Sequence, residues 1–414
     1  EIICEASFDF CGLYCAVDIL RKDGDGYSIY EVKSSTEIKP VYIFDISYQK
    51  YVLEKCGVNV KHTYLVYINN EYVREKELDI KQVFKVKNVD GLVAKEYGNV
   101  EGLLQSAEAM LADEQEPRID ISINCFAPYK CGFWKYCSKH LPNPSVFNMY
   151  RLPKIKAFEC YEQGVVSFED YERTGWYFSD KINRQVDFNL HDKGVYSDKG
   201  GIKKFLDTLS YPLYFLDFET MQPILPPFEG TSPYQQIPFQ YSLHYIEKEG
   251  GELKHKEFLA VSGENPLRAI AESLVKDIPT DVCTLAYNKA FECSRIKELA
   301  DTFPDLKAHL LNIRGNIKDL LDVFRDGYYY RKEIGGSFSI KSVLPAMFPN
   351  DPELDYHNLD GVHNGGEAMS IFPLIKDMPL EEQAVARHNL LKYCELDTYA
   401  MVKIWQALCD IVKE

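Results

Sequence analysis

The chain has 414 residues, with 47 Lys and Arg against 63 Asp and Glu, which gives a net charge of −16. This acidic excess excludes a protein that grips nucleic acid through bulk positive charge. The length exceeds one compact core and predicts two or three domains. No apolar run reaches the ~18 residues of a membrane span, and no signal peptide precedes the first domain, so we expect a cytoplasmic protein without a membrane partner.

The first predicted element is a β-hairpin near the N-terminus. Its two apolar strands are separated by a glycine-rich turn at residues 23–26, as in tight hairpins. Glu31 and Lys33 are two residues apart and share one strand face, and Asp18 lies on the preceding strand. In metal-assisted phosphodiester hydrolysis, Asp18 and Glu31 would bind the cation and Lys33 would stabilise charge or position the water. Acid-x-Lys also occurs on edge strands, where the lysine prevents pairing, and this alternative stays open.

The trio and the segment after it resemble the PD-(D/E)XK nucleases, in their RecB-like branch. The family pattern is Asp, a short gap, Glu-x-Lys and then a helix with Gln and often Tyr. Residues 45–51 supply this helix with Gln49, although Tyr51 is two rather than four residues further on. The resemblance implies a restriction-endonuclease-like α/β domain over residues 1–141, with Gln49 in the site and Mg²⁺ or Mn²⁺ as cofactor.

A regularly spaced cysteine set ends this domain. Among 12 cysteines, Cys125, Cys131 and Cys137 have five residues between each, and cysteines in a reducing compartment are thiols or metal ligands rather than disulfides. In RecB-like nucleases a cysteine ahead of the core joins three behind it, so the resemblance implies a [4Fe-4S] cluster. The chain begins at Glu1 in a predicted strand, so we expect that the N-terminal helix and the fourth ligand are lost. Zinc bound by the three cysteines and His140, or plain buried cysteines, are the alternatives.

Residues 142–205 are predicted to form a helical connector. Residues 156–163 have a helical pattern that stops at Gly164, and Ser167 begins a second helix with acidic residues in its first turn. Similar short hairpins touch the DNA backbone in repair proteins. We favour a packing spacer, because the glycine stop and the helix caps are sufficient to explain the pattern.

The strand at residues 214–220, YFLDFET, is the most informative segment. Side chains two apart on a strand share a face, so Asp217 and Glu219 point the same way at the end of a buried strand. Two adjacent carboxylates repel, and divalent cations between them make this tolerable, since Mg²⁺ and Mn²⁺ take hard oxygen ligands. Tyr393 and Asp397 are four apart in a helical stretch and therefore share one helical face.

A third acidic segment lies between these two. After the apolar run at residues 283–286, Asn288 is followed by Phe291 and Glu292, a pair that could open a helix. The three segments together resemble the DEDDy branch of the DnaQ-like 3′-to-5′ exonucleases, whose motifs are DxE, Nx2-3(F/Y)D and YxxxD. Glu292 stands where the family usually has Asp, and its longer arm changes how the carboxylate reaches a metal. The alternative is a pair of solvated acids at a strand end and a surface helix.

By this resemblance, Asp217, Glu219 and Asp397 would hold Mg²⁺ or Mn²⁺ and Tyr393 would orient the attacking water, in an RNase H-like domain over residues 206–414. Both halves, in this order, resemble a bacterial family known as a domain of unknown function, which joins a RecB-like nuclease to a DnaQ-like domain. The expected fold class is therefore α/β, with a mixed sheet flanked by helices in each domain.

The sequence predicts a metal-dependent nuclease, a phosphodiester hydrolase with 3′-to-5′ exonuclease activity in the C-terminal domain and a second nuclease site. DNA is favoured over RNA as the partner, in repair, recombination or phage defence. A nucleic-acid-binding module with inactive nuclease folds and a small-substrate phosphodiesterase are the alternatives. Candidates for local basic patches are Lys33, Lys39, Lys50, Lys61, Arg331, Lys332 and Lys341.

A second strand is predicted beside the acidic one. Residues 238–245 alternate so that Gln240, Ser242 and His244 share one face. His244 could contact substrate, and the favoured interpretation is a half-buried histidine with a hydrogen-bond partner.

Overall fold

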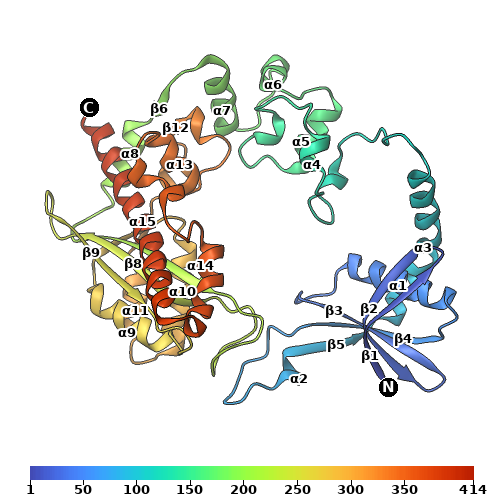
Figure 1. The fold of residues 1–414 in the computed structure, drawn as a ribbon. Helices are drawn as coiled ribbons and strands as arrows, with labels where there is room; N and C mark the ends of the chain where they lie inside the picture. The colour runs from blue at the N-terminus through green and yellow to red at the C-terminus, as the bar shows by residue number, and fades with distance from the viewer. The chain divides into compact units, whose positions relative to one another are not determined.

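The computed structural model describes residues 1–414 and divides them into two compact units. The first unit comprises residues 1–131 and 222–235, and the second comprises residues 132–221 and 236–414 (Figure 1). Both units are mixed α/β with their own sheets, which confirms the α/β class and no finer fold type. The predicted domain boundaries at residues 141 and 205 stay predictions. None of the helices combines the length and the apolar character that crossing a bilayer demands.

The first unit is built on a five-stranded mixed sheet in the order β1-β2-β3-β4-β5. β2 and β3 form the predicted antiparallel hairpin, with Gly24 at φ 59° in its turn, a conformation that favours glycine. β3 and β4 run parallel, so the connection between them crosses the sheet, and it contains α1. The elements of this unit are β1 (Ile2–Phe10), β2 (Leu13–Asp23), β3 (Gly26–Lys33), α1 (Pro40–Lys55), β4 (Val60–Ile68), α2 (Ile80–Val83), β5 (Phe84–Asn88) and α3 (Asp90–Leu111).

Helix α1 carries both apolar core residues and a buried polar residue of this unit. It begins with Pro40, whose fixed φ and missing N–H suit the first turn of a helix. Ile46 and Leu53 are fully buried and pack in the core with Leu65 of β4. The same helix buries Gln49, which is only 4% exposed. The apolar side of α1 therefore fixes the direction in which its polar side chains point.

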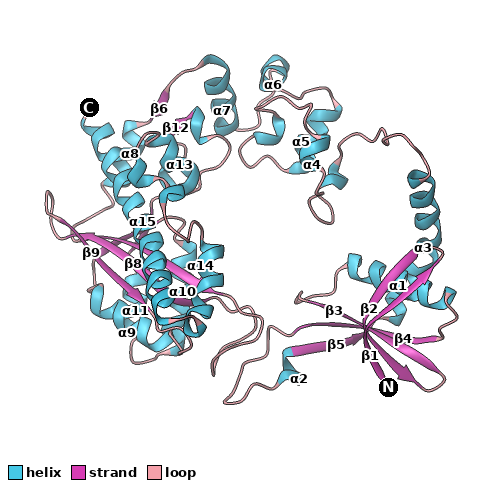
Figure 2. Ribbon diagram, in the orientation of Figure 1, coloured by secondary structure: helices cyan, strands magenta, loops and turns pink.

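The second unit contains a five-stranded sheet in the order β11-β10-β7-β8-β9, drawn in magenta in Figure 2. The central strand β7 is parallel to β10 and antiparallel to β8, and α15 packs against β7, β8 and β9. The strands of this unit are β6 (Val195–Ser197), β7 (Leu213–Met221), β8 (Ile237–Ile246), β9 (Leu253–Leu259), β10 (Cys283–Ala286), β11 (Ile317–Asp319) and β12 (Tyr329–Arg331). Its helices are α4 (Trp134–Cys137), α5 (Lys154–Glu162), α6 (Phe168–Thr174), α7 (Asp180–His191), α8 (Lys199–Leu206), α9 (Leu267–Asp277), α10 (Ala290–Thr302), α11 (Lys307–Gly315), α12 (Asp322–Arg325), α13 (Ile340–Met347), α14 (Gly365–Ile371) and α15 (Leu380–Lys413).

The connector has the helix–stop–helix form that the sequence predicts. Gly164 follows α5 at φ 77°. Ser167 caps α6 by accepting a hydrogen bond from the backbone N–H of Asp170, and the Asp170 carboxylate accepts one from the Ser167 N–H in return. Phe168 is 1% exposed and belongs to a small apolar cluster that includes Val186 of α7. Through these contacts the connector packs as part of the second unit.

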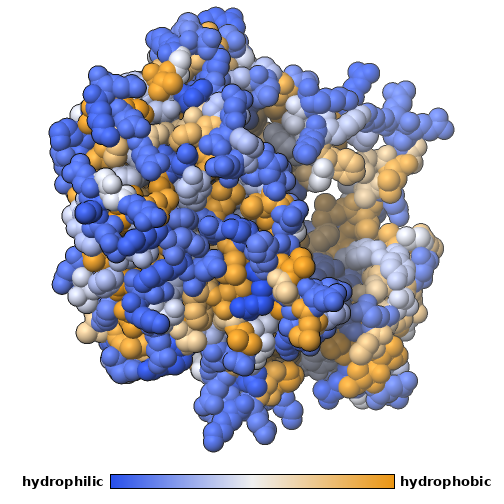
Figure 3. Space-filling view, turned by 60° about the vertical axis from the view of Figure 1, so that its left-hand side comes forward, coloured by the Kyte–Doolittle hydropathy of each residue, from blue (hydrophilic) through white to orange (hydrophobic).

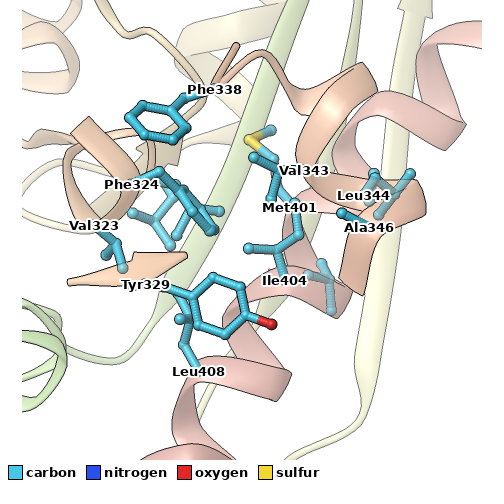
Figure 4. Packing of buried hydrophobic residues seen from close by; sticks show 14 of the residues in the cluster. Val323, Phe324, Tyr329, Phe338, Val343, Leu344, Ala346, Met401, Ile404 and Leu408 are labelled. Atoms are coloured by element: carbon cyan, nitrogen blue, oxygen red, sulfur yellow. The ribbon is translucent and has the colours of Figure 1, made fainter. Parts of the chain in front are cut away.

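The main core of the second unit lies beside the end of α15 (Figure 4). Met401, Ile404 and Leu408 of α15 are fully buried there and belong to the same cluster as Phe324. Phe215 of β7 packs edge-on against Trp405, at 5.7 Å between ring centroids. Burial of apolar surface contributes a free energy of about 25 cal/mol per Å². This contribution holds α15 against the sheet. The face shown in Figure 3 is mostly hydrophilic, with smaller hydrophobic areas between.

Candidate metal centre

Three carboxylates of the second unit converge beside β7. Asp217 and Glu219 lie on β7, and Asp397 lies on α15. Carboxylate oxygens of the three residues all lie within 4.8 Å of one another, and Glu219 and Asp397 are each 8% exposed. The alternation of the strand places the first two on one face, and the packing of α15 on that face brings the third to them. Three hard oxygen donors at this spacing could hold a divalent cation.

The proton affinities of these groups reflect burial and mutual repulsion. Burial, and then the charges of Asp397, Glu292 and Glu219, raise the pKa of Asp217 well above its usual range. Burial and Asp397 raise the pKa of Glu219 to about 8. Burial raises the pKa of Asp397 to about 6, against the lowering effect of a hydrogen bond and a nearby ammonium. The ionised cluster therefore needs compensating positive charge at neutral pH.

Glu292 is buried at the start of α10, which begins as the sequence predicts. It is 2% exposed, its Oε2 atom has no hydrogen-bond partner, and burial raises its pKa to about 8. Its charge acts on Asp217. Asn288 turns the chain into this helix at φ 67°, with its N–H donating to Oδ1 of Asp319 at 2.8 Å. Glu292 thus lies beside the carboxylate centre but outside the three-residue group.

Tyr393 lies one helical turn before Asp397 on α15, as its spacing predicts. Its ring is 4% exposed, and burial and then Asp397 raise the pKa of its hydroxyl far above the usual range. Lys341 lies near, with its Nζ atom 5.1 Å from the ring centre of Tyr356 and 5.5 Å from that of Tyr393. The Tyr393 hydroxyl is therefore a protonated hydrogen-bond donor at neutral pH.

Three neighbours of the centre are not among the candidate site residues named above. Tyr356 donates a 2.6 Å hydrogen bond to Oδ1 of Asp397. Cys394 is buried with its Sγ atom 3.9 Å from Oδ2 of Asp217. Gly365 begins α14, where a Cβ atom would lie 3.3 Å from Oε2 of Glu219. A cavity of about 710 Å³ beside Tyr356 is also lined by residues such as Lys341 and His363.

The first unit brings most of its predicted site residues together. Nζ of Lys33 lies 2.6 Å from Oε1 of Glu31 and 2.7 Å from Oδ2 of Asp45. Nε2 of Gln49 donates to Oε2 of Glu31 at 2.8 Å. Asp18 accepts a 2.7 Å hydrogen bond from the N–H of Val32, across the hairpin. Asp45 was not predicted, although its position one turn before Gln49 on α1 places both on one helical face.

Electrostatics in this cluster are dominated by the burial of Glu31. Burial raises the pKa of Glu31, against the hydrogen bonds from Lys33 and Gln49, and the charge of Asp18 adds to the increase. Burial opposes the charge of Lys33, but its hydrogen bonds to Asp45 and Glu31 outweigh this and raise its pKa. Gln49 Oε1 is buried without a partner. Lys33 therefore supplies the positive charge that holds two carboxylates in one place.

The cysteine set spans the division between the two units, which falls between Cys131 and Cys137. Cys125 is half-buried, and the other two are exposed. Within the first unit the backbone N–H of Cys131 donates to the carbonyl of Cys125 at 2.8 Å. His140, the alternative zinc ligand, has its Nε2 atom 3.1 Å from the hydroxyl of Tyr161. The cluster and its ligand set stay a prediction.

The seven basic residues considered as local patches are largely neutralised by neighbours. Six of them form ion pairs with carboxylates: Lys33, Lys39, Lys50, Lys61, Arg331 and Lys332. Lys341 instead donates to the carbonyl oxygen of His363 at 3.3 Å. Of these seven residues, Lys341 is therefore the one that lies beside the carboxylates and forms no ion pair.

Part of the chain is similar to known proteins. Residues 214–339 match a family described as a domain of unknown function (DUF2779). The chain is 26% identical over 220 residues to the uncharacterized protein MG366 of Mycoplasma genitalium, which covers 48% of this chain and 32% of that protein. It is 24% identical over 255 residues to the uncharacterized protein UU173 of Ureaplasma parvum, which covers 56% and 36%. The chain therefore spans about a third of the length of these curated relatives. No solved structure matches it.

Proposed function

We propose that the second unit is a metal-dependent nuclease that hydrolyses phosphodiester bonds with Mg²⁺ or Mn²⁺. The observation that carries this proposal is the convergence of Asp217, Glu219 and Asp397, whose oxygens lie within 4.8 Å of one another in a buried site. All three donors are hard oxygens, which these cations prefer. Their raised pKa values mean that ionisation without a cation costs stability, so the donor set fits a divalent ion.

The side chains around the centre have roles that follow from their charge and position. A bound divalent ion supplies Lewis acidity to a phosphoryl oxygen. Asp217, Glu219 and Asp397 would hold the ion, and the protonated hydroxyl of Tyr393 would orient the attacking water. The ammonium of Lys341 would offset negative charge on the phosphate. We propose that the nucleic acid is degraded in the 3′-to-5′ direction, from the resemblance to DEDDy exonucleases.

The first unit is proposed to hold a second nuclease site. Asp18, Glu31 and Asp45 would provide carboxylate oxygens, and the buried amide of Gln49 would orient Glu31 through its 2.8 Å hydrogen bond. Lys33 now bridges Glu31 and Asp45. When a cation takes over part of this neutralisation, the ammonium would become available to the phosphate.

Two fold types accompany this proposal. Residues 1–141 would have a PD-(D/E)XK fold of the RecB-like branch. Residues 206–414 would have an RNase H-like fold of the DnaQ type. Support comes from the mixed sheet in each unit and from the elements that carry the acids. DNA is the proposed substrate, with repair, recombination or phage defence as the setting. Because six of the seven basic residues considered as local patches are paired with carboxylates, binding of nucleic acid should depend on the cation and weaken in chelator.

Degradation of end-labelled oligonucleotides tests both sites. Single- and double-stranded DNA and RNA are incubated with Mn²⁺ or with chelator, using wild type, Asp217→Asn and Glu31→Gln. Matched controls are Asp410→Asn on α15 and Glu75→Gln in the first unit, both exposed carboxylates. We expect Mn²⁺-dependent cleavage of DNA that Asp217→Asn or Glu31→Gln reduces at least about 100-fold at its own site, while the controls cleave normally.

The outcomes separate the alternatives. Binding of intact DNA without cleavage would point to an inactive nucleic-acid-binding module. Cleavage of p-nitrophenyl thymidine phosphate with oligonucleotides spared would point to a small-substrate phosphodiesterase. If neither Asp217→Asn nor Glu31→Gln reduces cleavage, the assigned sites are wrong.

A metal bound by Cys125, Cys131 and Cys137 is a separate proposal. Three thiols suit an iron-sulfur cluster or zinc, and His140 is the candidate nitrogen ligand for zinc. Iron and acid-labile sulfide contents of anaerobically purified protein, set against its zinc content, distinguish the two.

A further inference from the structure

A second group of metal-binding side chains lies apart from the carboxylate centre. His244 on β8, His255 on β9 and Glu395 on α15 each offer a ligand atom, and these atoms lie within 4.8 Å of one another. The two histidines are direct partners in the β8–β9 register, with ring centroids 4.5 Å apart. Glu395 comes to them from α15, the long red helix packed against these strands in Figure 1. Three separate elements thus bring two imidazoles and a carboxylate together.

Hydroxyl groups hold both imidazole rings in place. Oγ1 of Thr398 lies 2.8 Å from Nδ1 of His244, and Oγ of Ser242 lies 2.9 Å from Nε2 of His255. The two hydroxyls are 2.6 Å apart. Each ring is therefore fixed through one nitrogen, which leaves the other nitrogen for a ligand. Histidines that bind metals are oriented by such a hydrogen bond to their second nitrogen.

Both rings have the charge state that metal binding requires. Burial, and then the neighbouring His255, lower the pKa of His244 to about 4. Burial also lowers the pKa of His255. The imidazoles are neutral at pH 7, so their lone pairs are available. Glu395 meets Lys392 at 2.7 Å through its Oε2 atom, which leaves Oε1 for a ligand.

We propose that His244, His255 and Glu395 form a zinc site that ties β8 and the edge strand β9 to α15. Zn²⁺ takes two imidazoles and a carboxylate, whereas Mg²⁺ and Mn²⁺ prefer oxygen alone. The ligand atoms lie within 4.8 Å of one another, and a bound ion would draw them to the ~3.4 Å spacing of tetrahedral zinc ligands. The ion would fix the helix that carries Tyr393 and Asp397. This proposal goes beyond the nuclease function and does not depend on it.

A cobalt titration of the full chain tests the proposal, in excess Mg²⁺ so that the oxygen sites are occupied. One equivalent of Co²⁺ should give the visible d–d bands of a nitrogen- and oxygen-ligated ion, and Zn²⁺ should displace it. The near-ultraviolet charge-transfer band of a thiolate ligand should be absent from this equivalent, which separates the site from the cysteine set. Asp217→Asn should keep these bands, so failure of the nuclease proposal and failure of this one are distinguishable.

Two substitutions decide whether the bands belong to this site. His255→Gln and Glu395→Gln should each weaken Co²⁺ binding by roughly tenfold or more, while Glu382→Gln, an exposed carboxylate on the same helix, should not. Glu395 is only partly buried, so its isosteric replacement keeps the fold, as circular dichroism will verify. Absence of the visible bands, or bands that survive both substitutions, would overturn the proposal.

Discussion

The hydroxyl of Tyr356 donates a 2.6 Å hydrogen bond to Oδ1 of Asp397 and so joins the short 3-10 helix Tyr356–Asn358 to the long helix α15 at the carboxylate centre. Burial raises the pKa of Asp397 to about 6, and this hydrogen bond works in the opposite direction, because it favours the ionised carboxylate. Tyr356 therefore helps to keep Asp397 ionised, as the proposed cation site requires.

Tyr356→Phe should move the pKa of Asp397 upward by about one to two units, since a hydrogen bond to a charged group is worth about 1.5–3 kcal/mol. The acid limb of the pH–rate profile for DNA cleavage should shift to higher pH by a similar amount, with little change well above pH 8. Steady-state cleavage rates between pH 5 and 9 measure the shift. Tyr177→Phe, which removes an exposed hydroxyl bonded to Asp180, is the control. An acid limb that stays in place would show that Tyr356 does not set this ionisation.

Without divalent ions, the second unit should lose stability as the pH rises. Glu219 and Glu292 have folded-state pKa values of about 8, against 4.5 for an ordinary glutamate. Between these values the folded state keeps protons that the unfolded state has released, so the free energy of unfolding decreases with pH and levels off above pH 8. Thermal unfolding in chelator, followed from pH 4.5 to 9, measures this trend. A stability that rises through this window would contradict it.

Added Mn²⁺ should reverse this loss at pH 8. Binding at a hundredfold excess over Kd contributes about 2.7 kcal/mol, which corresponds to a rise in Tm of roughly 5–10 °C. Asp217→Asn should remove most of the rise, because it deletes one carboxylate of the centre. The exposed substitution Asp410→Asn should retain it.

Sequence spacing predicted the parts of the centre that depend on local geometry. Asp217 and Glu219 share a strand face and Tyr393 and Asp397 share a helix face, because the periods of strand and helix fix these relations. Tyr356 could not be found in this way, since it lies in a single 3-10 turn, Tyr356–Asn358, whose approach to Asp397 is set by tertiary packing. Asp45 could have been found from its four-residue spacing to Gln49. The convergence of β7 with α15 needed the tertiary structure.

Lys33→Met should destabilise the first unit. Glu31 and Asp45 would lose the ammonium between them, and Glu31 is 4% exposed. Removing one partner of a buried pair is costly, but 24% exposure of the Lys33 side chain admits solvent screening, so we expect about 1–2 kcal/mol. Urea unfolding measures the change.

Two further variants define the origin of that loss. Lys61→Met removes a surface pair with Asp25, whose side chain is 80% exposed, and should leave the unfolding midpoint nearly unchanged. Adding Glu31→Gln to Lys33→Met should restore part of the lost stability, since it removes the buried charge left unpaired. No recovery in the double variant would mean that packing, rather than charge, accounts for the loss.

Gly365→Ala should reduce cleavage while preserving the fold. A Cβ atom at this position would lie 3.3 Å from Oε2 of Glu219, closer than an ordinary contact, so the carboxylate must move by a few tenths of an ångström. Alanine is compatible with the helix that begins here. Because a 1 Å displacement at a catalytic centre costs about 100-fold, this smaller one should lower kcat by about 3- to 10-fold. Gly315→Ala, where nothing lies within 4 Å of the added atom, is the matched control. Equal kcat values for the two variants, with equal Tm, would show that the position of Glu219 does not limit the reaction.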